Sequence, residues 1–139
     1  MGKINLGKVI AGGLVAGLVL NVFDFVLHGV ILAADWNAAL AALNKPAMGG
    51  NTIGMYVGFD FLTGIGLVWL YAAIRPRFGP GVQTAVIAGI AGWFFCGLIA
   101  TLYQMPNGIF PMKLMVMPLV ASLVFAPVAT VAGASIYKE

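Results

Sequence analysis

The residues best suited to chemistry are polar side chains that interrupt apolar stretches. Asn21, Asp24 and His28 lie in one apolar run, and Tyr56 and Asp60 lie in a second. An ionisable side chain at membrane depth is costly, so it faces protein or water and marks a candidate functional site. Two carboxyl groups and an imidazole that titrate as a coupled set could relay protons, bind a cation or orient a polar ligand.

The polar residues of the first run share a helix face with two glycines. At roughly 100° per residue, Gly13, Gly17, Asn21, Asp24 and His28 fall in an arc about 80° wide. This face carries small residues at one end and polar residues at the other, while the remaining faces are apolar. We therefore expect the glycines to pack against another helix and the polar residues to meet a partner or a cavity.

The composition predicts an integral membrane protein. Of the 139 residues, 62% are hydrophobic and 8% are charged, whereas soluble domains carry about 25% charged residues. At about 20 residues per span, the chain has room for four spans and no soluble domain, so residues 1–139 form a single membrane domain. There is no basic stripe for nucleic acid, and there is no HExxH, GxSxG or phosphate-loop motif, so we do not expect an enzyme.

We expect an all-α polytopic protein, a bundle of four transmembrane helices with a short interfacial helix between helices 1 and 2. The predicted spans cover about residues 6–33, 52–74, 82–104 and 112–137. The segment 35–45, DWNAALAALNK, has apolar residues at helical spacing and is expected to lie on the membrane surface, with Trp36 at the headgroup level. The segment 75–81, RPRFGPG, contains two prolines and is expected to form a tight loop that ends the second span.

The basic residues predict the orientation. Five basic residues lie on one side of the membrane in the predicted topology: Lys3, Lys8, Arg75, Arg77 and Lys138. The other two, Lys45 and Lys113, lie on the opposite side. The positive-inside rule then places both termini in the cytoplasm.

The two acidic residues are predicted to meet. Asp24 lies near the outer end of the first span, and Asp60 lies near the outer start of the second, so antiparallel helices bring them to one level. His28 is then near Tyr56. Thr63, Thr101 and Gln104 are further members of this polar cluster. Several structural roles compete with a functional one: His28 could bond to Asp24 or Tyr56 and lock two helices, and the carboxyl groups could be neutral glue or contact a partner subunit.

His28 is the only candidate metal ligand, and a haem role needs a second axial ligand. A second subunit or Met105 could supply that ligand. Cys96 lies alone in an apolar run, where a small apolar filler is the expected role.

Small residues predict close helix packing. Gly54 and Gly58 are one helical turn apart on the second span, and Ser122 and Gly133 lie on a small-residue face of the fourth. Together with the lack of soluble surface, this pattern favours a small membrane subunit that forms a homo-oligomer or serves as an accessory subunit of a larger membrane complex. The alternatives are an oligomeric transporter or proton/ion conductor using the Asp/His cluster, and a haem- or pigment-binding subunit.

Three segments carry a resemblance to known proteins. They are GLVAGLVLNVFDFVLHGVILAADW, WLYAAIRPRFGPG and the Ala/Gly-rich last span that ends at Tyr137. On these segments the chain resembles small bacterial membrane proteins of a domain-of-unknown-function family. The resemblance implies a four-span protein of the bacterial inner membrane, and it implies no site residues.

Overall fold

A computed structural model describes residues 2–138, which form helices and linkers with no strand among them. Four helical stretches are long and apolar enough to cross a membrane: Leu6–Ile31, Gly50–Phe78, Val82–Asn107 and Met112–Ala134. Their large apolar side chains point outward, and Phe25, Leu62 and Phe95 are each about two thirds exposed. A lipid environment accounts for such a surface, and the predicted all-α bundle of four spans is confirmed.

Two of the spans change their helical geometry partway along. The first consists of α1 (Leu6–Asp24) and a π-helical segment, η1 (Phe25–Ile31), and the third begins with α4 (Val82–Gly92). The third continues through a second π-helical segment and two short helices: η2 (Trp93–Ile99), α5 (Ala100–Gln104) and the 3₁₀ turn η3 (Met105–Asn107). The second and fourth spans are α3 (Gly50–Phe78) and α6 (Met112–Ala134).

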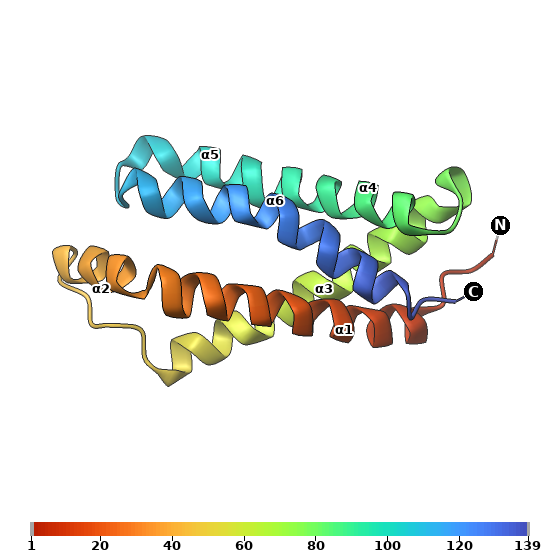
Figure 1. The fold of residues 1–139 in the computed structure, drawn as a ribbon, viewed down its shortest axis with the longest axis horizontal. Helices are drawn as coiled ribbons and strands as arrows, with labels where there is room; N and C mark the ends of the chain where they lie inside the picture. Colours follow the sequence, from red (N-terminus) through yellow and green to blue (C-terminus); the bar gives the residue numbers. More distant parts are fainter. Residues whose placement is uncertain (1, 139) are drawn as a thin grey trace.

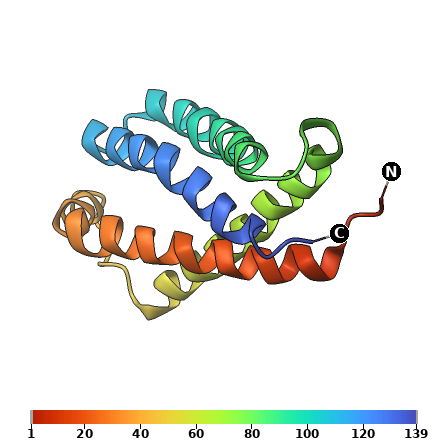
Figure 2. The same ribbon diagram turned by 45° about the vertical axis from the view of Figure 1, so that its right-hand side comes forward.

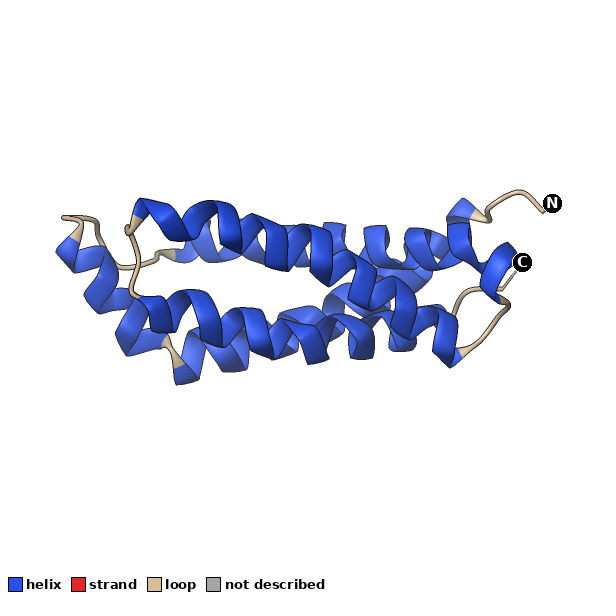
Figure 3. Cartoon of the chain, turned by 90° about the horizontal axis from the view of Figure 1, so that it is seen from above, coloured by secondary structure: helices blue, strands red, loops and turns tan. Residues whose placement is uncertain are grey.

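The two termini lie at one end of the bundle, which we call the terminal end (Figure 1). The short helix α2 (Ala33–Ala42) and the turn before α6 lie at the opposite end, which we call the distal end. Helix α3 crosses the other spans diagonally, and its first half diverges from them toward the distal end (Figures 1 and 2). Helix α2 turns away from the axis of the first span (Figure 3), as a surface helix would.

The loop prediction for residues 75–81 is wrong in its first half. Helix α3 continues through Pro76 and ends at Phe78, followed by Gly79 with φ +84°. Proline has a helical φ, and Pro76 removes only its own N–H bond to the carbonyl one turn earlier, so the helix continues to the first residue with left-handed backbone. The Thr84 hydroxyl then donates to the Gly79 carbonyl at 2.7 Å and closes the turn into α4.

Buried apolar side chains form two separate clusters. The larger cluster fills the terminal half and joins the four spans around Val68, Ala85 and Ala129, each fully buried. The smaller cluster lies under α2 and includes Leu32 and Leu114. The two cores are distinct, so the region between them is held by fewer buried contacts.

Glycines allow the spans to cross closely in the terminal half. A Cβ on Gly13 would lie 2.4 Å from the Ile65 Cα, and a Cβ on Gly64 would lie 2.4 Å from the Gly13 carbonyl oxygen. Gly12 and Gly133 form the equivalent contact between α1 and α6. Backbones that approach this closely exclude any larger residue at these positions.

No other part of this chain packs against Gly54 and Gly58. A Cβ at either position would meet no atom within 4 Å. Both glycines belong to the first half of α3, and that half of the helix diverges from the bundle (Figure 1). Spacing identified a small-residue pair but gave no information on which helix, if any, lies beside it. Ser122 also differs from its predicted packing role, since its hydroxyl donates to the Leu119 carbonyl at 2.9 Å and the residue borders a cleft.

Candidate ligand-binding cleft

A cleft of about 400 Å³ opens in the distal half of the bundle. Residues from the first, second, third and fourth spans and from α2 line it. They are Asp24, His28, Trp36, Tyr56, Gly97, Thr101, Gln104, Phe110, Leu114, Met115, Pro118, Leu119 and Ser122. Trp36, on α2, and Phe110, in the turn before α6, lie at the distal end, whereas Asp24 and Ser122 lie farther in. The cleft therefore runs from the distal end toward the middle of the bundle.

Asp24 and Asp60 meet at the inner part of this cleft. Asp24 is the last residue of α1 and borders the cleft, and Asp60 lies on α3 within side-chain hydrogen-bonding reach of it. Both side chains are partly buried. An ionised carboxylate only accepts hydrogen bonds, so a bond between two carboxyl groups requires one of them to carry a proton. Since two ionised carboxylates repel each other at short range, the pair is suited to share one proton.

His28 pairs with a residue that the sequence analysis did not consider as its partner. The Trp36 indole Nε1–H donates to His28 Nδ1 at 2.9 Å, so the expected bond to Asp24 or Tyr56 is replaced by one to α2. An indole nitrogen only donates, which requires an unprotonated Nδ1 and places the histidine proton on Nε2. The bond ties α2 to η1, and it leaves Nε2–H as a donor that a ligand can use.

The reason for this partner is the change of helical geometry. At the end of η1 the Leu32 N–H donates to the Leu27 carbonyl, five residues back, at 2.8 Å. The wider turn alters the direction of side chains relative to a regular α-helix, so the α-helical arc predicted for His28 no longer applies. The α2 helix begins immediately afterward, which places Trp36 beside the imidazole, with ring centroids 5.8 Å apart.

Asn21 serves the contact between helices. Its side-chain amide donates to the Gly17 carbonyl of its own helix at 2.9 Å and to the Val57 carbonyl of α3 at 3.4 Å. It therefore links α1 to α3 one turn from Asp24 and does not border the cleft. Within the predicted polar cluster, Asn21 therefore has a structural role, whereas other members line the cleft.

The outer members of the predicted cluster have different positions. Tyr56, Thr101 and Gln104 line the cleft, whereas Thr63 is exposed on α3 away from it. Tyr56 is 57% exposed and contacts Phe59 edge to face. Its ring thus forms part of an open wall.

Irregular backbone surrounds the cleft on three sides. His28 belongs to η1, Gly97 belongs to η2, and Pro118 interrupts the hydrogen bonding of α6. The Trp93 indole donates to the Leu119 carbonyl at 2.9 Å and joins η2 to α6 at this level. Segments of π-helix frequently accompany functional sites, and here two of them border the same cavity.

Trp36, Phe110 and Ser122 are among the cleft residues that sequence reasoning missed or assigned elsewhere. Trp36 is predicted as an anchor at the membrane interface, and Ser122 is predicted on a packing face. Their actual positions depend on the bend at Leu32 and on Pro118, and neither effect on direction can be read from hydrophobic periodicity. In the sequence, the adjacent Asp35 and Trp36 near the start of α2 were the signal that pointed to this region.

Metal binding has little geometric support in the part of the chain that the structure describes. Among residues 2–138 no three His, Cys, Asp or Glu side chains converge as a ligand set. Cys96 is exposed on η2. The candidate chemistry therefore belongs to carboxyl, imidazole, aromatic and hydroxyl groups.

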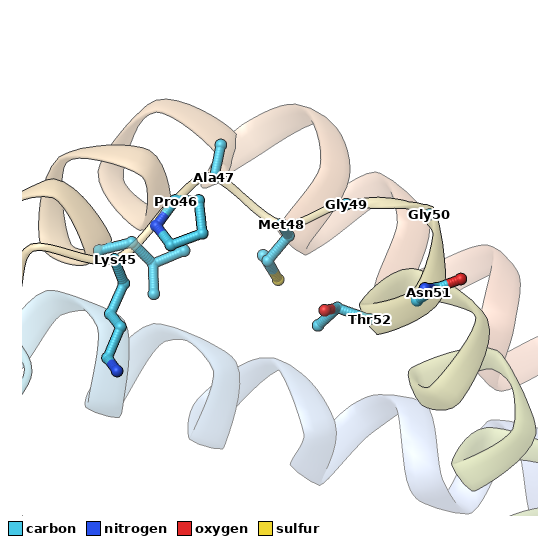
Figure 4. Close-up of a pocket in the computed structure, with 9 residues that line it drawn as sticks. Lys45, Pro46, Ala47, Met48, Gly49, Gly50, Asn51 and Thr52 are labelled. Atoms are coloured by element: carbon cyan, nitrogen blue, oxygen red, sulfur yellow. The ribbon is translucent and has the colours of Figure 1, made fainter.

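A second hollow lies beneath the linker between α2 and α3. It has a volume of about 590 Å³ and is lined by Leu40 and residues 45–52 (Figure 4). Lys45 is its only charged side chain, and the other residues expose mainly backbone and small side chains. This hollow offers no paired titratable groups, so the polar cleft is the better candidate site.

The basic side chains lie away from the inner cleft. At the distal end Lys113 pairs with Asp35 at 3.1 Å, and at the terminal end the Arg75 guanidinium lies 5.5 Å from the Tyr137 ring centroid. The cleft thus contains acidic and neutral groups without a neighbouring basic residue in its lining. No protein-family model, no curated protein and no solved structure matches this chain.

Proposed function

We propose that this protein binds a monovalent cation at Asp24 and Asp60 in exchange for the proton that the two carboxyl groups share, and that it moves the cation across the membrane. The observation that carries the proposal is this pair of carboxyl groups from two spans beside an open polar cleft. A monovalent cation that replaces the proton would leave the net charge of the site unchanged. Ionisable residues within spans commonly mark ion or proton paths.

The test is flux in proteoliposomes with an imposed pH gradient. Asp24→Asn and Asp60→Asn should each reduce sodium-coupled proton movement to the level of empty liposomes, because an amide cannot exchange a proton. Asp35→Asn is the matched control: Asp35 pairs with Lys113 outside the cleft, and its variant should retain flux. Unchanged flux in both intramembrane variants, with intact elution profiles, would overturn the proposal.

A role as a subunit of an oligomer is the second candidate, and a separate observation favours it. Residues 50–59 of α3 are all exposed, and a Cβ added to either Gly54 or Gly58 would meet no atom within 4 Å. A second chain is one occupant that suits this half-helix, since small residues permit close helix contact. Oligomerisation would also let a four-span cation transporter enclose its transport path between subunits.

Cysteine cross-linking tests this second candidate. In a Cys96→Ala background, Gly58→Cys should form a disulfide-linked dimer in membranes. Gly66→Cys, at a position where an added Cβ also meets no atom within 4 Å but which lies farther along α3, is the matched control. A strictly monomeric mass in mild detergent, with no co-purifying protein and no cross-link at Gly58, would contradict it.

For orientation, we propose that both termini face the cytoplasm of a bacterial inner membrane. The cluster of basic residues at the terminal end supports the orientation by the positive-inside rule. In the Cys96→Ala background, a membrane-impermeant maleimide added to spheroplasts should label Asn51→Cys and leave Lys138→Cys unlabelled. The reverse labelling would invert the orientation.

A further inference from the structure

The mouth of the cleft is lined by aromatic rings from three different segments. Trp36 belongs to α2, Tyr56 belongs to α3, and Phe110 belongs to the turn before α6. The Trp36 and Phe110 rings contact edge to face, with centroids 5.6 Å apart. Faces of aromatic rings attract organic cations, and the attraction increases when the cation is removed from water.

The inner part of the same cleft is acidic. Asp24 lines it, Asp60 lies against Asp24, and no Lys or Arg is among the lining residues. An anion here would lose its hydration without gaining a positive partner, which is a large penalty. The lining therefore selects against anions and favours a positively charged ligand.

The size of the cleft exceeds the need of a bare ion. Its volume of about 400 Å³ corresponds to about thirteen water molecules at about 30 Å³ each. A small inorganic ion would fill only part of this volume and would leave the aromatic rings without a role. An organic ammonium ion instead uses one carboxylate and several ring faces, which matches the groups present.

We propose that the cleft binds the ammonium group of a small organic cation between Asp24 and the Trp36, Tyr56 and Phe110 rings. This inference rests on the proposed cation exchange and names the class of its substrate. The ammonium group enters from the distal end, passes the rings and reaches the carboxyl pair. Its source is either a free organic cation or the headgroup of a phospholipid, since both carry the same chemistry.

Isothermal titration of the purified full chain with tetramethylammonium, in a maltoside detergent, tests the ligand class. Trp36→Leu should weaken binding about tenfold because it removes a ring face from the site. Trp36→Phe keeps a ring and should stay within about threefold of the unmodified protein. Trp69→Leu is the control for loss of a tryptophan: Trp69 is 48% exposed and lies outside the cleft lining, so binding should not change.

A second variant protects the test against misfolding of the first. Tyr56 is mostly exposed and its ring contacts Phe59, a residue of the same helix, so Tyr56→Leu leaves the bundle intact. It should weaken tetramethylammonium binding severalfold while leaving the elution profile and helical signal unchanged. Equal affinity in Tyr56→Leu and the unmodified protein would overturn the aromatic contribution.

Two other results distinguish the inferred binding of an organic cation from the proposed cation exchange on which it rests. Sodium binding that Asp60→Asn abolishes, without measurable tetramethylammonium binding, would overturn the organic ligand and leave cation exchange in place. Absence of binding for both ions would overturn both. Repeating the titration in phosphatidylcholine nanodiscs identifies the source: a weaker apparent affinity than in maltoside indicates competition by the lipid headgroup, and an equal affinity indicates a free cation.

Discussion

Helices α1 and α3 touch backbone to backbone in the terminal half, whereas in the distal half the same two helices diverge. The terminal contact depends on Gly13 and Gly64, whose positions leave no space for a Cβ. The distal contact depends on side chains: Asn21 reaches the Val57 carbonyl, and Asp24 reaches Asp60. Close packing transmits strain and resists rearrangement, while a region with fewer buried contacts can open locally. Stability therefore resides in the terminal half, and the candidate binding cleft lies in the distal half.

The largest effect is expected at the glycine crossing. Gly64→Ala places a Cβ against the Gly13 carbonyl and the Gly17 nitrogen, both at 2.4 Å, so the helices must separate. Overpacking of this kind costs about 1–3 kcal/mol and occasionally more. Thermal unfolding followed by circular dichroism in detergent measures the loss of stability.

Gly58→Ala is the matched control for that substitution. The new Cβ meets no atom within 4 Å, and alanine is favoured over glycine within a helix by about 0.5–1 kcal/mol. Stability should therefore stay equal or rise. If Gly64→Ala and Gly58→Ala behaved alike, the two halves of α3 would not differ in packing and the comparison would fail.

A smaller effect is expected from the tie between α2 and the first span. Trp36→Phe removes the indole donor to His28 and should reduce stability by about 0.5–1.5 kcal/mol, the usual contribution of one hydrogen bond. The change should be local, so amide hydrogen exchange should accelerate across α2 and not across α4. Uniform acceleration throughout the chain would mean that α2 belongs to the same cooperative unit as the terminal half.

The smallest effect concerns the exposed ion pair at the distal end. Lys113→Ala removes the partner of Asp35 at 3.1 Å, but the two side chains are 55% and 35% exposed. Pairs in water contribute about 0.2–1 kcal/mol and are weakened by salt. The melting temperature should therefore shift only slightly, and the shift should shrink in high salt. A large, salt-independent loss would show that the pair closes the distal end more firmly than its exposure indicates.

The fold was largely predictable because the spans are apolar and the linkers are polar or rich in glycine and proline. Pro76 was the main failure, since it removes only one helical hydrogen bond and α3 continues to Phe78, where Gly79 ends it. The approach of Asp24 to Asp60 also followed from their depth in antiparallel spans. Neither the four spans nor the approach of the two carboxyl groups required detailed packing information.

The remaining features of the site depend on geometry that periodicity does not encode. The π-helical turn in η1 redirects His28, and the bend at Leu32 brings Trp36 beside it. The same α-helical spacing described Gly13 and Gly58 equally well, yet one meets α3 and the other meets no atom of another helix. A sequence pattern identifies a face, whereas the helix that covers the face depends on the crossing angles of the whole bundle.

Counting the protons released on cation binding is the decisive measurement for exchange at the carboxyl pair. The purified protein, in weakly buffered solution near neutral pH, is titrated separately with sodium chloride and tetramethylammonium chloride while released protons are counted. Exchange predicts about one proton for each bound cation, because one carboxyl group of a bonded pair carries a proton. It predicts no proton release in Asp60→Asn, because that variant has no carboxyl pair to share a proton. Cation binding without proton release in the unmodified protein would contradict exchange at Asp24 and Asp60.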